Sequence, residues 1–314
     1  MSDREAVSVA GATTGGRGDL NNKLFAALLS AVLIAFLAAT LLVLFSNVWY
    51  LAQANSTVGK SGWEIFVAAL RDPEVHFSIR LSVTTAFLTM LVSMLVAIPA
   101  AYVLSRYRFP GEKLVDTLLD LPIVVPPPVI GMSLLMFFMT PAGDLVNHLT
   151  PLPLVKALNA FLSLCTGHSI SDDGSSWVYT TRAIVMAQFF IACAFGLRTV
   201  KATFDTIGTR HEEVARTLGC TRRQAFFKVV LPMARTGLVA GAVMTWARAI
   251  AEFGPVLFFA GSTRLKTEVM PIAMFLMYSS GEIEKAVALV IIMIAISAVT
   301  LLVFKRLGGK GYLW

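Results

Sequence analysis

Long apolar runs alternate with shorter polar segments along almost the whole chain. A helix needs about 20 apolar residues to cross the hydrocarbon core of a bilayer. Six runs reach or approach that length, at residues 24–48, 81–104, 114–139, 183–197, 237–260 and 286–304. The pattern predicts an all-α integral membrane protein with six transmembrane helices, folded as one domain over residues 23–310.

Composition agrees with a lipid environment. Only 14% of the residues are charged and 56% are hydrophobic, whereas soluble domains carry about a quarter charged residues. The net charge of +7 lies in short segments between the apolar runs. Aromatic residues are not interleaved with the basic ones, so nucleic acid is not an expected partner. Three cysteines far apart indicate neither a disulfide framework nor a metal site.

The distribution of basic residues predicts the orientation, because cytoplasmic loops are enriched in Lys and Arg. With the N-terminus inside, 17 of the 26 basic residues fall on the cytoplasmic side. We therefore expect both termini in the cytoplasm and two long extracytoplasmic loops, at 49–80 and 140–182. The second loop contains an apolar piece, Leu154–Leu164, that is too short to span and fits a surface helix, and its residues 172–176 fit an exposed turn.

The first 22 residues are rich in small and polar types and have no apolar period. Such a composition predicts a disordered cytoplasmic tail over residues 1–22. The apolar run that follows is too long for the core of a signal peptide, so we expect it to be a membrane span.

The most polar stretch inside the membrane domain, residues 205–232, has a helix–break–helix pattern. Residues 212–218 favour a helix that carries Val214 and Leu218 on one face. Gly219 follows at a position suited to a left-handed turn. Thr221 and Gln224 then fit a capping box for a second helix. The pattern alone is equally compatible with a plain interhelical loop.

The same stretch resembles the coupling-loop signature of ABC importer permeases: Glu-Ala-Ala, three residues, Gly, nine residues, an aliphatic residue, one residue, then Leu-Pro. The matching residues are Glu213, Val214, Ala215, Gly219, Val229, Leu231 and Pro232. The only departure is Val214 in place of the first alanine. The resemblance implies a type I ABC importer architecture, in which two separate ATPase subunits dock on this element, with ATP and Mg bound by them and no cofactor or catalytic residue on this chain.

Three further segments resemble permeases for tetrahedral oxyanions. They are the proline-rich segment 121–131, the segment 246–254 and the segment 259–267. The likeness covers residues 80–306 and implies a molybdate or tungstate importer in the cell membrane, with sulfate or thiosulfate as the alternative cargo. It also implies an extracytoplasmic oxyanion-binding protein and a second permease copy, most simply a homodimer.

Polar and proline residues inside the runs are candidates for the translocation path. Prolines free backbone carbonyls, which a bilayer tolerates beside protein or a water-lined cavity. The triple Pro126, Pro127 and Pro128 therefore fits either a path or a kinked structural helix. Arg248 and Glu252, four residues apart, could contact the anion or pair to brace the helices. Gln188 could line the path or make a structural hydrogen bond.

Two other functions fit the sequence less well. A self-contained secondary transporter often shows two similar halves, which this sequence lacks. An intramembrane enzyme is disfavoured because the segment beginning His211-Glu212 lacks the second histidine of a zinc protease and no Gly-x-Ser-x-Gly elbow occurs.

Overall fold

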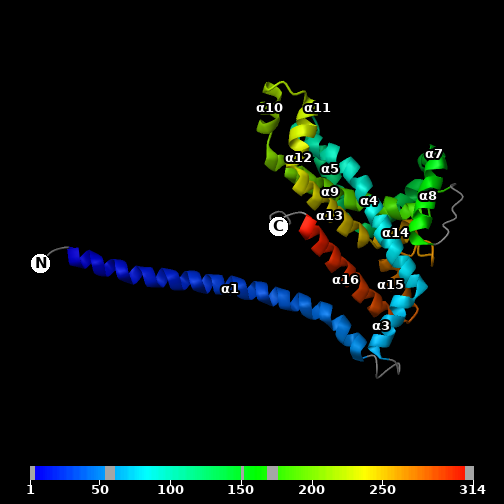
Figure 1. Cartoon of the computed structure of the whole chain (residues 1–314), viewed down its shortest axis with the longest axis horizontal. Coiled ribbons are helices and arrows are strands. Elements are labelled where there is room, and N and C mark those ends of the chain that lie inside the picture. The colour runs from blue at the N-terminus through cyan, green and yellow to red at the C-terminus, as the bar shows by residue number, and fades with distance from the viewer. Residues whose placement is uncertain (1–3, 54–60, 150–151, 168–175, 308–314) are drawn as a thin grey trace. The chain divides into compact units, whose positions relative to one another are not determined.

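The structure is a computed structural model that describes residues 4–53, 61–149, 152–167 and 176–307. The chain divides into two units, residues 1–63 and residues 64–314. Helices are the only regular secondary structure in the described residues of each unit (Figure 1), which confirms the all-α prediction.

The first unit is dominated by one long helix, α1 (Arg4–Gln53). Its residues Asn22–Gln53 are long and apolar enough to cross a membrane, as the first run predicted. The helix also continues back to Arg4, where the sequence predicted a disordered tail. An existing helix lengthens at little cost, because each added residue gains one hydrogen bond and no new nucleus is needed.

Three helices make the interior of the second unit: α4 (Pro73–Arg106), α9 (Thr181–Ile207) and α13 (Arg235–Ile250). The helices α4 and α9 extend the second and fourth predicted spans, and α13 covers the first part of the fifth. Glycines allow α9 and α13 to cross closely, as small residues do between membrane helices. A Cβ on Gly196 would lie 2.2 Å from Thr245 Oγ1, and one on Gly237 would lie 2.1 Å from Thr203 Oγ1.

Two of the predicted spans are broken. The run 114–139 forms α5 (Glu112–Val124) and α6 (Pro127–Phe138), whose axes differ by 108°. The run 237–260 forms α13 and then α14 (Gly254–Phe259) after a break at residues 251–253. Each second helix starts with proline in its first turn, where the missing N–H costs nothing. By length and composition the described residues contain four spans, or six if α5 with α6, and the stretch Arg222–Met233 with α13, each count as one bent span.

Shorter helices complete the unit, and α3 (Gly62–Arg71) crosses the boundary between the units. The expected surface helix at Leu154–Leu164 is present as α8 (Leu152–Thr166), preceded by α7 (Pro141–Leu149). The expected turn at 172–176 lies outside the described residues apart from Ser176. The apolar helix α15 (Met270–Ser279) was not predicted, and α16 (Ile283–Leu307) contains the sixth run.

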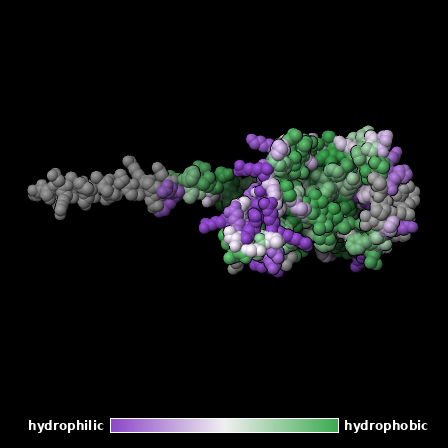
Figure 2. Space-filling view, turned by 90° about the horizontal axis from the view of Figure 1, so that it is seen from above, coloured by the Kyte–Doolittle hydropathy of each residue, from purple (hydrophilic) through white to green (hydrophobic). Residues whose placement is uncertain are grey.

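The surface of the second unit is largely apolar, with polar side chains gathered over the end that carries α10 and α11 (Figure 2). Buried residues form clusters between the long helices, and one of these clusters joins α4, α13, α15 and α16. This distribution is that of a helical bundle whose sides face lipid.

Candidate coupling element and path residues

Two short helices with a glycine turn between them project beyond the ends of α9 and α13 (Figure 1). They are α10 (Arg210–Thr217) and α11 (Arg222–Ala225). Gly219 has φ +91°, and the amide of Cys220 donates to Ala215 O at 3.1 Å across the turn. A left-handed residue after the last helical turn satisfies carbonyls that would otherwise lack a donor. The helix–glycine–helix prediction is therefore confirmed.

The second half of the element begins with the predicted capping box. The backbone amide of Gln224 donates to Thr221 Oγ1 at 3.3 Å, and the backbone amide of Thr221 donates to the side-chain oxygen Oε1 of Gln224 at 2.9 Å. A π-helical turn, η1 (Phe226–Val230), follows, and α12 (Leu231–Met233) leads into α13. Pro232 lacks an N–H, and its ring crowds the turn before it. The wider π turn at that place accommodates the ring.

The element separates its side chains into a buried and an exposed face. Ala215, Ala225 and Val230 are buried against the bundle. Val214 on α10 and Leu218, the C-cap residue of that helix, are 52% and 81% exposed. Two neighbouring apolar side chains on an otherwise charged helix form a small surface that a partner protein could cover.

Contacts that the sequence did not predict hold α10 against the end of α4. Glu212 Oε1 lies 2.5 Å from Arg106 Nε, and Glu212 Oε2 accepts from the Tyr102 hydroxyl at 2.8 Å. Arg106 Nη2 also donates to Gly208 O at 3.1 Å, where the chain turns between α9 and α10. More than 100 residues separate Arg106 from Glu212, so no local pattern could have revealed the pair.

A second unforeseen cluster ties α5 to α9. Arg198 Nη1 lies 2.8 Å from Asp116 Oδ1, and its Nε hydrogen-bonds the carboxylate of Asp120. The two aspartates share one face of α5 at i, i+4 spacing. The spacing was visible in the sequence, whereas the partner on another helix was not. The cluster fixes the first half of the broken span against the bundle.

The three prolines lie where α5 meets α6, and Pro128 lies against the start of α14. A Cβ placed on Gly254 would lie 2.9 Å from Pro128 Cγ, and one placed on Gly131 would lie 2.6 Å from Pro255 Cα. The two broken spans therefore touch at their breaks. The geometry gives Pro128 a packing role, and whether Pro126, Pro127 and Pro128 border a path stays a prediction.

The polar path candidates each contact a different neighbour. Gln188 is buried, accepts from Thr89 Oγ1 at 2.9 Å and donates to Thr85 Oγ1 at 3.4 Å, both on α4. Arg248 Nη1 lies 2.7 Å from Glu252 Oε2, and its guanidinium carbon is 5.6 Å from the centre of the Phe195 ring. These contacts match the structural alternative for each residue, and the structure does not gather the candidates into one site.

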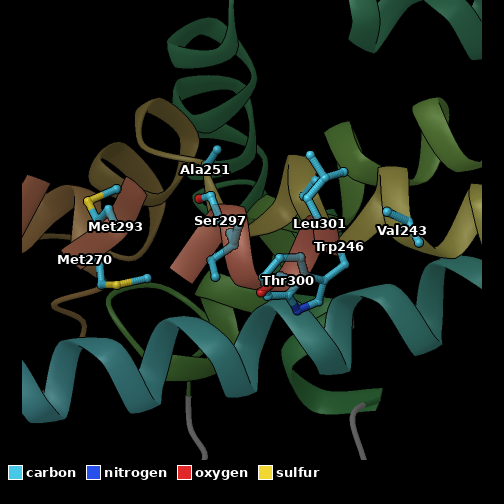
Figure 3. Close-up of a pocket in the computed structure, with 10 residues that line it drawn as sticks. Val243, Trp246, Ala251, Met270, Met293, Ser297, Thr300 and Leu301 are labelled. Carbon is cyan, nitrogen blue, oxygen red and sulfur yellow. The ribbon is translucent and has the colours of Figure 1, made fainter. Parts of the chain in front are cut away.

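A separate cavity of about 100 Å³ lies between α13, α15 and α16 (Figure 3). Trp246 and Met270 border it together with Ser297 of α16. The lining includes none of the polar path candidates. Among the described residues, no three His, Cys, Asp or Glu side chains gather as a metal site would require.

Comparison with known proteins places this architecture among transport permeases. Residues 90–310 match the family described as binding-protein-dependent transport system inner membrane component. The sulfate transport system permease protein CysT of Escherichia coli is 30% identical over 86% of this chain and 87% of its own length. The molybdate/tungstate transport system permease protein WtpB of Thermococcus kodakarensis is 35% identical over 78% of this chain and 80% of its own.

Solved structures share the fold. A bacterial ABC transporter that imports the acidic polysaccharide alginate has a chain that aligns with a TM-score of 0.64 and 18% identity, covering 90% of this chain and 94% of its own. The alginate transporter in complex with its alginate pentasaccharide-bound periplasmic protein aligns with a TM-score of 0.63 and 19% identity, covering 90% of this chain and 96% of its own.

Proposed function

The chain belongs to the family of binding-protein-dependent transport system inner membrane components, and from this we propose that it is the membrane-spanning permease subunit of an ATP-driven importer for a tetrahedral oxyanion. It is a multi-pass protein of the inner membrane. Two copies would enclose one path, with two ATPase subunits on the cytoplasmic side and an oxyanion-binding protein on the other.

The observation that carries the proposal is the element formed by α10 and α11. It exposes Val214 and Leu218 and is held to α4 by the Arg106–Glu212 pair. A docking surface needs exposed apolar side chains. An element that transmits movement of the ATPase subunits to the membrane spans also needs a rigid connection to those spans. The sequence has no Gly-x-x-x-x-Gly-Lys-Ser/Thr phosphate loop, which is consistent with ATP and Mg being bound by the partner ATPase and not by this chain.

The mechanism that follows is alternating access. Closure of the ATPase subunits on ATP would draw the two 205–232 elements together. Because α10 is bonded to the end of α4, and α4 packs along α9 and α13, the three interior helices would rotate as a group. The path would then open toward the binding protein, accept the anion, and release it to the cytoplasm after hydrolysis.

The cargo is proposed from the relatives. One permease named for molybdate/tungstate and one named as a probable molybdenum transporter are each 35% identical, and the sulfate permease of E. coli is 30% identical over a longer stretch. We propose molybdate or tungstate, with sulfate as the second candidate. The affinity of the cognate binding protein for molybdate, tungstate and sulfate, measured by direct titration, decides between the two proposals for the cargo.

The proposal is tested by reconstituting the chain with its ATPase subunits and binding protein in liposomes. The Leu218→Asp variant should lose both ATPase co-purification and ATP-dependent molybdate uptake, because a charge would sit in the docking surface. Leu164→Asp is the matched control, since Leu164 on α8 is equally exposed, at 83%, and should leave both unchanged. Uptake that persists without any ATPase would instead identify a secondary transporter and overturn the proposal.

A further inference from the structure

Four exposed cations lie along the segment that joins α11 to α13: Arg222, Arg223, Lys228 and Arg235. Within the described residues, none of them is paired with a carboxylate. The sequence explains this, because no Asp or Glu occurs between Glu213 and Glu252. We call these four residues, with the exposed ring of Phe227 among them, the basic patch.

The inward side of the same segment fixes the depth of the basic patch relative to the spans. The Phe226 ring packs 4.6 Å from the Tyr102 ring and 6.4 Å from the Phe204 ring, centre to centre. Tyr102 and Phe204 lie within about one turn of the ends of α4 and α9, a rise of about 6 Å or less. Phe227 and Lys228 follow directly on Phe226, so the basic patch lies at the level where two membrane spans end.

The direction of the stretch Arg222–Met233 also indicates a position at the membrane surface. The helical stretch Arg222–Met233 is bent by 71° from α13. When α13 crosses the bilayer, this stretch therefore runs closer to the plane of the membrane than to its normal. Its buried side is apolar, with Ala225 and Val230 fully covered, and its other side combines cations with an aromatic ring. Helices that lie in the interface have this composition on the side toward the headgroups.

Phe227 strengthens the assignment to a lipid surface. Its ring is 55% exposed and lies 6.0 Å from the guanidinium carbon of Arg223. An exposed aromatic ring beside cations is poorly placed in water, whereas at the interface the ring can enter the acyl boundary while the cations stay among phosphates. From depth, direction and charge we propose that the basic patch binds the headgroups of anionic phospholipids and anchors the base of the coupling element to the membrane surface.

The proposal is tested with the full-length chain in phosphatidylcholine liposomes that contain a trace of photoactivatable phosphatidylglycerol. Cross-linked peptides are then mapped by mass spectrometry. Labelling of residues 222–235 should fall at least about fivefold in the Arg222→Gln/Arg223→Gln/Lys228→Gln variant, since each cation near an anionic surface contributes to the attraction. Arg222→Lys/Arg223→Lys keeps the charge and should keep the label, which separates loss of binding from loss of fold.

Two controls decide between lipid and other anions. Arg216→Gln removes an exposed cation from the last turn of α10, at the end of that helix away from α4, and should leave the phosphatidylglycerol label unchanged. Excess inorganic phosphate or molybdate should not displace the label, whereas competition by either would identify a site for a free anion. Equal labelling by a phosphatidylcholine probe would overturn the proposal. Unchanged phosphatidylglycerol labelling in the triple variant would also overturn the proposal. If the triple variant in addition no longer bound the ATPase subunits, an acidic surface of the ATPase would be the partner of the basic patch.

Discussion

Arg106, the last residue of α4, and Glu212, in the first turn of α10, form an ion pair with 2.5 Å between Nε and Oε1. Their side chains are only 6% and 14% exposed, although both lie at the polar end of the unit. Tyr102 donates to the second carboxylate oxygen, so both oxygens of Glu212 have partners on α4. The start of α10 and the end of α4 therefore move together.

Removing one member of this pair should destabilise the protein and uncouple ATP hydrolysis from transport. Arg106→Ala leaves the Glu212 carboxylate largely buried without its cation, at a cost of about 3 kcal/mol. We expect a lower melting temperature in detergent and a loss of uptake that exceeds the loss of ATPase activity. The double variant Arg106→Met/Glu212→Met should recover the melting temperature but not uptake. Full uptake by Arg106→Ala would show that the pair transmits no movement.

A side chain at Gly219 should impair coupling through the backbone conformation and not through bulk. The residue has φ +91°, and an added Cβ would meet nothing within 4 Å. A β-branched residue is strained there, by roughly 1–2 kcal/mol or more. A transporter that carries Gly219→Val should therefore still hydrolyse ATP at its ATPase subunits but no longer take up the anion. Gly219→Asn, which adopts left-handed conformations more readily, should retain clearly more uptake, and equal losses in both variants would show that size matters instead.

Local patterns in the sequence were sufficient for the elements whose determinants are local. The apolar runs located the long helices, and Thr221 with Gln224 located the start of α11 because both members of a capping box lie in one turn. The contacts of Arg198 with Asp116 and Asp120 join residues about 80 positions apart, which periodicity cannot reveal. The break at residues 251–253 was missed because its neighbours are as apolar as a continuous span.

Arg248 and Glu252 should act as a brace between α13 and its continuation. The Glu252 side chain is 2% exposed, so Arg248→Ala would leave a buried carboxylate uncompensated, at a cost of about 3 kcal/mol. Arg248→Met/Glu252→Leu removes both charges and should restore the melting temperature together with most of the uptake. If the double variant folds normally but no longer transports molybdate, Arg248 contacts the anion in the path.

The contact between the two broken spans should not tolerate an added methyl group. In Gly254→Ala the new Cβ would lie 2.9 Å from Pro128 Cγ and 3.0 Å from its Cδ. Overpacking of this kind costs typically 1–3 kcal/mol, which should appear as a lower melting temperature. Pro128→Ala removes both ring atoms, so the double variant should be more stable than Gly254→Ala alone. No such rescue would mean that the backbone nitrogen of residue 128, which would lie 3.0 Å from the new Cβ and stays in the double variant, limits the approach of the two helices.

Glu268, in the loop between α14 and α15, should make stability depend on pH. Burial raises the pKa of this carboxyl above its ordinary value of 4.5; hydrogen bonding from the Leu265 amide lowers it, and the charge of Glu74 raises it further. A carboxyl with a raised folded-state pKa contributes its full stability below pH 4.5 and loses that contribution as the pH rises through the folded-state pKa. Glu268→Gln stays neutral and can still accept the Leu265 amide at Oε1.

We therefore expect Glu268→Gln to melt at a higher temperature than the unchanged protein at neutral pH. The difference should shrink as the pH is lowered and vanish near pH 4.5, in melting curves recorded in detergent. Asp144→Asn, which removes an exposed carboxylate on α7, serves as the control for the loss of one negative charge. A difference for Glu268→Gln that is constant from pH 4.5 to 8 would mean that the buried carboxyl does not change its charge on folding, and that the loop admits water.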